Sequence, residues 1–324
     1  MRVAIVTPGL GPCGGARIIA ELCVRLRERG HDAMVVGPGI QAGWLGLEPP
    51  TMPFSMARSA KPFDAVIATG HETVVPASQL QSDRYYYYVQ MMEHMFYPKG
   101  GNGYNMALGS YDFAKKKGFK FTVISGWQAE WLAEKYGIVA PVISVAVNRR
   151  HFYPDGPKGD YFLVEGDNRN PAKDIECLGW RVGEVVRAKY GLKMYGFAGY
   201  RHSYADEFDK FLAVPTITQM RQMESGARFL IKASRYEGRA GAVSECMVCG
   251  TTSARAIIAG DDDVVDGYTG LRVDYDYDAL LDAAETLASD AILRRTLAAN
   301  GLKHTEDHLQ WEPVMDKLIK YWSN

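Results

Sequence analysis

Short apolar runs alternate with amphipathic stretches along the first 150 residues. The run from Arg2 to Thr7 is apolar and ends in glycines, which predicts a buried parallel strand. Residues 18–26 place their apolar side chains on one helical face, and residues 32–36 predict a second strand, so the chain opens with a βαβ unit. Further strands are expected at residues 63–68, 85–90, 121–124 and 142–146. A Ser-x-x-Gln capping box at Ser125 predicts one more helix, which Gly137 ends.

The alternation restarts after residues 148–159, where two prolines and two glycines are typical of an interdomain linker. Strands are expected at residues 161–165, 193–198, 228–232 and 254–258. Helices are expected at residues 174–190, 242–249, 279–289, 291–300 and 312–321. Two such runs predict an α/β fold with two doubly wound, Rossmann-like domains. We expect them at residues 1–150 and 151–304, followed by a terminal helix within residues 305–324.

The composition is that of a soluble globular protein, with 324 residues, 47% hydrophobic and 23% charged. A formal net charge of −1 argues against nucleic acid or an anionic membrane as the main partner, although a local basic patch could still bind either. No apolar run approaches the ~18 residues of a membrane span, and the chain starts directly with a strand-like segment. The five cysteines are scattered, and Cys246-x-x-Cys249 lacks the further ligands that zinc requires. These features predict reduced thiols and a cytoplasmic location.

The most informative segment runs from Ala233 to Gly250 and carries Glu237 and Glu245, eight positions apart with glycines between them. The first carboxylate is expected on a loop and the second on the first turn of a helix. Both then face the carboxyl end of the sheet, where open α/β folds bind ligands. Carboxylates accept directed hydrogen bonds from sugar hydroxyls, and the loop amides and helix N-terminus favour phosphate.

This segment resembles the E-x7-E signature of glycosyltransferase family 4, close to S-x-x-E-G-F-G-x-P-x-x-E-A-M-A-C-G. The stretch 264–271, VVDGYTGL, is similar to the family's V-x-D/E-G-x-T-G-L. The resemblance extends over essentially the whole chain and implies a GT-B architecture, with two Rossmann-like domains facing a central cleft. It departs from the family at Arg239-Ala240, where Phe-Gly is usual, and at Ala242, where Pro is usual. These departures leave the identity of the donor sugar open.

The resemblance also implies roles for individual residues of the second half. Glu237 would lie near the donor sugar, and Glu245 would hold the ribose hydroxyls. The amides of Arg239, Ala240 and Gly241 would face the sugar or diphosphate. Arg169 and Lys173 occupy the place of the family's R-x(n)-K pair and would neutralise the leaving nucleoside diphosphate.

Glycines in the first half follow the opening strand. Gly9-x-Gly11-x-x-Gly14 formally matches a dinucleotide fingerprint, but the second strand ends Val35-Val36-Gly37 without the acidic residue that grips a ribose. We therefore favour the family 4 interpretation, in which Gly14 and Gly15 let the backbone approach the donor phosphate or the acceptor.

Further candidates follow the tyrosine-rich segment 85–88, which is expected to be a buried strand rather than a stacking platform. Residues 89–97, VQMMEHMFY, resemble the V-Q-D-x-E-x-x-F-Y of rhamnosyltransferase-like members. This resemblance makes Glu93 and His94 catalytic candidates and Tyr97 an acceptor-binding candidate. His71 follows the strand expected at residues 63–68, so it belongs at the carboxyl end of the sheet and is a second acceptor-binding candidate. A lone histidine is equally often structural, so both interpretations of His71 and His94 stay open. Residues 100–103, GGNG, are expected to form a mobile loop over the acceptor.

Taken together, the resemblance implies a retaining, hexosyltransferase-like enzyme. It would move a sugar from a nucleoside diphosphate sugar to a hydroxyl acceptor such as a glycan, a lipid or a natural product. No cofactor or metal site is expected, because Asp261-Asp262-Asp263 falls in a turn and GT-B enzymes of this family generally work without metal. The alternatives are an epimerase or phosphorylase on the same architecture, a glycosyltransferase acting on modified DNA, and a non-catalytic nucleotide-sugar-binding protein. Trp311, Val314, Leu318 and Trp322 share one helical face, so the terminal helix either crosses back to the first domain or caps the second.

Overall fold

A computed structural model of the chain describes residues 1–38, 43–165, 170–260 and 264–324. The chain divides into two compact units. The first unit consists of Met1–Val145 together with Trp311–Asn324, and the second unit is Ala146–Gln310. The division lies close to the boundary expected at residue 150. Residues 148–159, expected as a linker, belong to the second unit, where Phe152 is part of the hydrophobic core.

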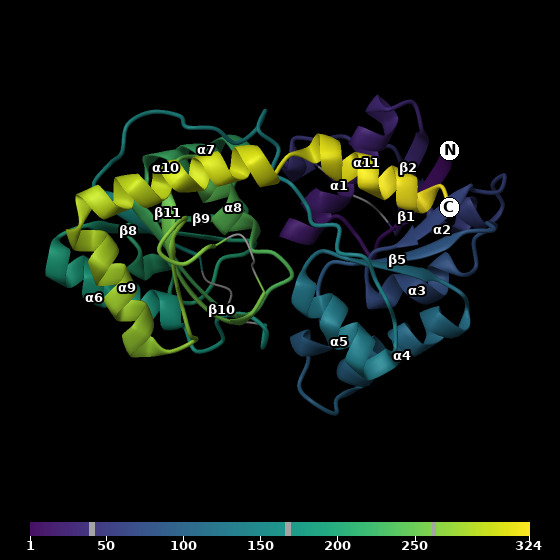
Figure 1. The fold of residues 1–324 in the computed structure, drawn as a ribbon, viewed down its shortest axis with the longest axis horizontal. Coiled ribbons are helices and arrows are strands. Elements are labelled where there is room, and N and C mark those ends of the chain that lie inside the picture. Colours follow the sequence, from purple (N-terminus) through teal and green to yellow (C-terminus); the bar gives the residue numbers. More distant parts are fainter. Residues whose placement is uncertain (39–42, 166–169, 261–263) are drawn as a thin grey trace. The chain divides into compact units, whose positions relative to one another are not determined.

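Six parallel strands form the sheet of the first unit, in the order β3-β2-β1-β4-β5-β6. They are β1 (Arg2–Val6), β2 (Asp32–Gly37), β3 (Thr51–Pro53), β4 (Ala65–Ala68), β5 (Tyr85–Val89) and β6 (Lys120–Val123). Its helices are α1 (Gly14–Glu28), α2 (Phe54–Arg58), α3 (His71–Ala77), α4 (Asn102–Lys116), α5 (Gly126–Tyr136) and α11 (Trp311–Trp322), with short 3-10 turns at Gly43–Leu45 and Glu93–Phe96. Helices lie on both faces of the sheet, with α1 and α11 on one and α3, α4 and α5 on the other (Figure 1).

The second unit repeats this plan. Its strands run parallel in the order β12-β11-β10-β7-β8-β9. They are β7 (Tyr161–Glu165), β8 (Lys193–Ala198), β9 (Lys210–Ala213), β10 (Phe229–Tyr236), β11 (Thr252–Ala259) and β12 (Leu271–Val273). Its helices are α6 (Leu178–Tyr190), α7 (Ile217–Gly226), α8 (Gly241–Val248), α9 (Tyr277–Ser289) and α10 (Ala291–His308), with a 3-10 turn at Ala205–Glu207. Numbered within each unit, both sheets have the order 3-2-1-4-5-6, so the predicted pair of doubly wound α/β folds is confirmed.

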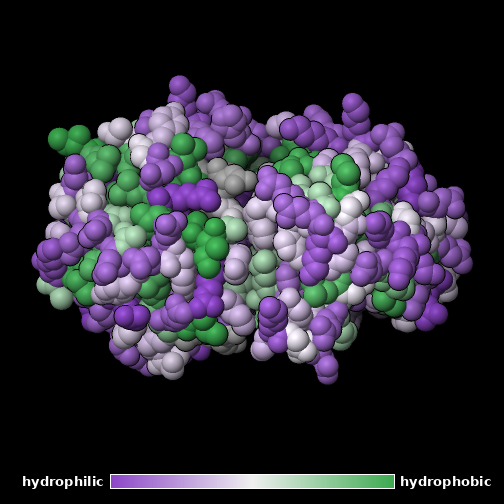
Figure 2. Space-filling model, turned by 60° about the horizontal axis from the view of Figure 1, so that its bottom comes forward, coloured by the Kyte–Doolittle hydropathy of each residue, from purple (hydrophilic) through white to green (hydrophobic). Residues whose placement is uncertain are grey.

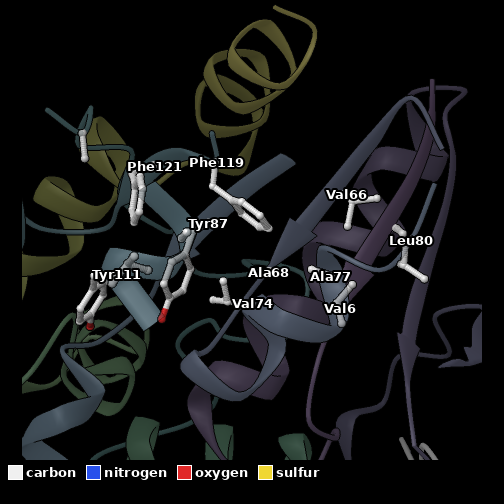
Figure 3. Packing of buried hydrophobic residues seen from close by; sticks show 14 of the residues in the cluster. Val6, Val66, Ala68, Val74, Ala77, Leu80, Tyr87, Tyr111, Phe119 and Phe121 are labelled. Carbon is white, nitrogen blue, oxygen red and sulfur yellow. The ribbon is translucent and has the colours of Figure 1, made fainter. Parts of the chain in front are cut away.

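Central strands are buried on both faces, which explains their continuous apolar runs. In the first unit, Tyr87 packs from β5 against Phe121 of β6 and Tyr111 of α4, with ring centroids 5.6 Å and 5.7 Å away (Figure 3). Tyr86, Tyr87 and Tyr88 are all fully buried. The expectation of a buried strand at the tyrosine-rich segment is therefore confirmed.

The outer surface is mostly hydrophilic on the face drawn in Figure 2, where hydrophobic residues lie in scattered groups. Exposed apolar side chains such as Met106 and Val139 come from separate segments. Among the described residues, no helix combines the length and the apolar character that a membrane crossing needs.

Helix α11 packs on the first unit although it ends the chain (Figure 1). Trp311, Met315, Leu318 and Trp322 are buried, and the Tyr321 hydroxyl donates to the carbonyl of Phe121 at 3.0 Å. The Arg25 guanidinium of α1 lies over the Trp311 ring at 5.0 Å. The terminal segment was expected to begin at residue 305. Helix α10 instead continues to His308, and the part of the chain that packs on the first unit begins at Trp311.

Three local expectations were wrong. Residues 142–146 form no strand but a single bridge between Val142 and Val123, because the chain leaves the sheet edge after two backbone hydrogen bonds. Helix α6 begins at Leu178 rather than at Asp174, whose carboxylate instead accepts the N–H groups of Leu178 and Gly179. The expected mobile loop at residues 100–103 runs into α4, which begins at Asn102.

Replacing Leu318 by alanine tests the docking of α11. The side chain is fully buried, so the change should lower the free energy of unfolding by about 2–5 kcal/mol. Urea denaturation measures the loss. Lys317→Ala, on the exposed side of the same helix, is the control and should stay within about 0.5 kcal/mol of wild type. Equal effects of the two changes would show that α11 adds no packing energy.

Candidate functional site at the carboxyl ends of the strands

A row of charged side chains crosses the centre of the second sheet. Lys232 of β10 pairs in register with Glu165 of β7 on one side and with Arg255 of β11 on the other. Register partners of parallel strands point to the same face, so the three side chains are neighbours. Lys232 and Arg255 are 3% and 0% exposed, and the Lys232 ammonium forms an ion pair with Glu165. This row lies where β7 and β10 meet, at the point where the strand order reverses.

Glu237 follows β10 directly and is 3% exposed. Its Oε2 accepts a hydrogen bond from the Lys173 ammonium, and its Oε1 lies 3.3 Å from Lys232 Nζ. Burial alone would raise the pKa of this carboxyl, but Lys173, Lys232 and Arg255 outweigh burial and lower the pKa to about 2. Glu237 is therefore a buried, ionised carboxylate held by two lysines, and not a solvated surface group.

The backbone of Glu237 is held as tightly as its side chain. Its N–H donates to the carbonyl of Ala259 at 3.0 Å, which joins the loop after β10 to the end of β11. Gly260 then has φ +112°, and a Cβ there would lie 1.9 Å from the Glu237 carbonyl oxygen. Only glycine fits this position without moving Glu237.

Helix α8 begins at Gly241, one residue earlier than expected, so Glu245 lies at the start of its second turn. Glu245 is 9% exposed, and its Oε1 lies 3.7 Å from the Cβ position of Gly241. The side chain of Glu245 thus points towards the N-terminus of α8. Ala240 is the N-cap residue and is buried, while Arg239 Nε donates to the Ser244 hydroxyl at 3.2 Å. The two carboxylates therefore flank the loop and first turn that the sequence singled out.

The segment after β7 contributes Lys173, and Asp174 next to it is buried. Asp174 anchors the start of α6 and accepts a hydrogen bond from the Tyr275 hydroxyl at 2.9 Å. Burial raises the pKa of the Asp174 carboxyl, although these hydrogen bonds and Lys232 oppose the rise. Arg169, the other expected diphosphate ligand, lies outside the described residues.

The first unit brings Glu93, His71 and Tyr97 together after β4 and β5. Glu93 Oε2 accepts from the backbone N–H of His71, which opens α3, and from its Nδ1 at 2.9 Å. Glu93 Oε1 lies 2.8 Å from the Cβ position of Gly70, so a side chain there would displace the carboxylate. Tyr97 Oη lies 3.4 Å from His71 Nε2.

The hydrogen bond that His71 donates to Glu93 determines which ring nitrogen of His71 carries a proton. Because a carboxylate only accepts, Nδ1 holds a proton, and Nε2 can accept from a hydroxyl when the ring is neutral. Burial lowers the pKa of His71, but the hydrogen bond and charge of Glu93, with Glu72, raise it above its usual value. The arrangement can orient a hydroxyl group and exchange a proton with it.

His94 lies in an aromatic layer of the first unit. It is 5% exposed and stacks on Trp131 at 4.7 Å, with Tyr104 at its edge. Burial, with a smaller contribution from Lys135, lowers its pKa to about 4, so the ring is neutral at pH 7. The ring of His94 thus contacts the aromatic side chains of Trp131 and Tyr104, whereas the ring of His71 contacts Glu93 and Tyr97.

Helix α1 begins at Gly14, and Cys13 caps it by accepting the Ala16 N–H at 3.4 Å. A Cβ at Gly14 would meet no described atom within 4 Å, which leaves the backbone of the first turn open to approach. At Gly15 the nearest atom would be Gln90 Oε1, 3.3 Å away. The first turn of α1 and the end of β5 are therefore adjacent.

Glu165, Lys232 and Arg255 were not predicted as site residues from the sequence. A signal was present, because Lys232 and Arg255 each interrupt a run of apolar or small residues, FLIKAS at residues 229–234 and TSARAIIA at residues 252–259. A charged side chain in a strand buried on both faces needs an oppositely charged partner. Such an interruption therefore marks a candidate site even when no motif contains it.

No cluster of three or more histidine, cysteine, aspartate or glutamate side chains suited to a metal occurs in the described part of the chain. Asp261, Asp262 and Asp263 lie outside that part. Cys246 and Cys249 are buried free thiols.

Solved structures match this fold over its whole length. A sucrose-phosphate synthase from Thermosynechococcus elongatus aligns with TM-score 0.77 and 16% identity, covering 99% of this chain and 98% of that one. HepE from Anabaena, in complex with UDP-glucose, aligns with TM-score 0.79 and 13% identity over 100% and 99%. WaaG, a glycosyltransferase involved in lipopolysaccharide biosynthesis, aligns with TM-score 0.77 and 12% identity over 99% and 100%. No protein-family model matches the sequence, and no curated protein matches it either.

These similarities, together with two parallel six-stranded sheets of the same strand order, define the fold as that of GT-B glycosyltransferases. The expected pair of Rossmann-like domains with this fold is confirmed. Identities of 12–16% establish the fold alone, so the activity must be argued from the site.

Replacing Gly260 by alanine tests the constraint on Glu237. We expect it to lower the free energy of unfolding by at least about 2 kcal/mol more than Gly267→Ala, because both glycines have positive φ but only Gly260 lies against Glu237. A Cβ at Gly267 meets no described atom within 4 Å. Thermal and urea unfolding of both variants measure the difference. Equal losses would show that the left-handed backbone, and not contact with Glu237, requires glycine.

Proposed function

We propose that the chain is a retaining glycosyltransferase of family 4 type, which transfers a sugar from a nucleoside diphosphate sugar to a hydroxyl acceptor. The observation that carries the proposal is the pair Glu237 and Glu245, buried on either side of the α8 N-terminus. Amides at a helix N-terminus favour phosphate, and carboxylates bind sugar hydroxyls. Similar structures support a nucleotide-sugar donor, since HepE is known in complex with UDP and glucose and with UDP-glucose.

In the proposed reaction, the bond between the anomeric carbon and the diphosphate oxygen breaks as the acceptor oxygen attacks from the same face. The nucleoside diphosphate leaves with the electron pair, and one of its phosphate oxygens takes the acceptor proton. Lys173, with Arg169, would stabilise the negative charge that grows on the diphosphate. Glu245 would hold the ribose hydroxyls, and Glu237 would position the donor sugar. No protein nucleophile is needed.

The first unit supplies the acceptor side of the proposal. His71, oriented by Glu93 and next to Tyr97, is suited to position an acceptor hydroxyl or a donor-sugar hydroxyl. The open backbone at Gly14 suits an approaching phosphate or acceptor. The acceptor itself is a hydroxyl compound whose class these residues leave open.

A donor screen tests the proposed function. UDP-, GDP- and dTDP-sugars should each be compared by thermal shift, and a bound donor should raise the melting temperature by mass action. The stabilising donor should then be hydrolysed slowly or transferred, with the anomeric configuration retained, and excess EDTA should leave the rate unchanged. Binding without either reaction would favour a non-catalytic nucleotide-sugar-binding protein. Loss of activity in EDTA, restored by Mg²⁺ or Mn²⁺, would contradict metal independence.

Glu245→Ala tests the donor site directly. Loss of a charge-assisted hydrogen bond to the ribose should weaken nucleotide binding by about 1–3 kcal/mol. Isothermal calorimetry with the nucleotide of the stabilising donor measures the change, and circular dichroism checks the fold. Glu134→Ala, at an exposed position of α5, is the control and should bind normally. Unchanged affinity in the folded Glu245 variant would remove Glu245 from the site.

A further inference from the structure

Two lysines contact the two carboxylate oxygens of Glu237, and their side chains differ in exposure to solvent. Lys173 contacts Oε2 from the segment between β7 and α6, and its side chain is 23% exposed. Lys232 faces Oε1 from inside β10, and its side chain is 4% exposed. Lys173 can therefore turn to a ligand, whereas Lys232 cannot leave without disrupting the strand.

We propose that Lys232 is a positioning residue, which keeps Glu237 ionised and in place when Lys173 moves from Glu237 to the donor diphosphate. The inference rests on the proposed function, because it needs a phosphate ligand for Lys173. Lys232 lies outside the E-x7-E segment, and the row Glu165–Lys232–Arg255 would hold it in place.

The need for a second cation follows from burial. A carboxylate that loses its ion-pair partner inside a protein takes up a proton rather than remain charged. A protonated Glu237 would also become a hydrogen-bond donor and would present a different surface to sugar hydroxyls. Lys232 remains 3.3 Å from Oε1, so Glu237 keeps a direct counter-ion after Lys173 has moved.

Lys232 is itself fixed by its neighbours. Glu165, its register partner, forms an ion pair with it, and Arg255 Nη1 donates to the Lys232 carbonyl at 3.4 Å. Burial lowers the pKa of Lys232, but Glu165 and Glu237 outweigh burial and raise it above its usual value. Lys173 after β7, Lys232 of β10 and Arg255 of β11 all lower the pKa of Glu237, and Glu165 acts on Glu237 through Lys232.

Carbon-13 NMR of labelled glutamate carboxyls tests the inference without any ligand, and Glu237→Gln assigns the signal. Lys173→Met imitates the departure of Lys173, and the pKa of Glu237 should stay below its ordinary value of 4.5. In Lys173→Met/Lys232→Met the pKa should rise above 4.5. Lys173→Met/Lys232→Arg keeps the second charge and should restore the low pKa. A pKa above 4.5 in Lys173→Met alone would overturn the proposal.

Calorimetry with UDP at pH 5, in buffers of different ionisation enthalpy, adds a test that needs only the single variant Lys232→Met. This variant should take up a measurable fraction of a proton more on binding UDP than the wild type does, because its Glu237 loses both lysines and its pKa then rises above 4.5. Equal proton uptake by the two proteins would overturn the proposal. If UDP bound to neither protein, the UDP-based form of the proposed function would fail, while the NMR titration would still decide the role of Lys232.

Discussion

The cost of burying the Glu237 carboxylate determines how the second unit is built around its site. An ionised carboxylate that leaves water needs close counter-charges, and here they come from Lys173 and Lys232. Lys232 is buried in turn and needs Glu165, which fixes charged partners in register on β7 and β10. One buried charge therefore constrains residues on separate strands, because each buried member of the network needs an oppositely charged neighbour.

In each unit, a glutamate of the candidate site also lies close to a glycine, in space that a larger residue would need. In the second unit the carbonyl of Glu237 lies where a Cβ of Gly260 would be. In the first unit the carboxylate of Glu93 occupies the corresponding space at Gly70 and accepts the His71 N–H. The chemistry of the two positions differs, since Glu237 is held by lysines and Glu93 by a histidine. In both, the carboxyl ends of parallel strands bring together loops that are distant in sequence.

The alternating apolar and amphipathic segments were sufficient to predict the α/β class, the two doubly wound sheets and most strand positions. Strands at residues 161–165 and 193–198 were predicted with their observed bounds, because glycines, prolines and charged residues mark their ends. Short edge strands such as β3 and β9 were missed, since three or four residues carry little periodic signal. Asp174 was predicted to begin a helix, but it precedes α6 and its carboxylate accepts the N–H groups of the first turn.

Sequence by itself determined the architecture and the E-x7-E segment, because both depend on local spacing along the chain. Tertiary structure decided which groups surround Glu237, that His71 is oriented by Glu93 while His94 stacks on Trp131, and that α11 packs on the first unit. More than sixty residues separate Glu165 from Lys232, and helix α8 lies between Lys232 and Arg255 in the sequence. Only strand order and register make the three residues neighbours. The physical reason is that a pKa or an ion pair depends on distance and burial in space, and neither follows from separation in sequence.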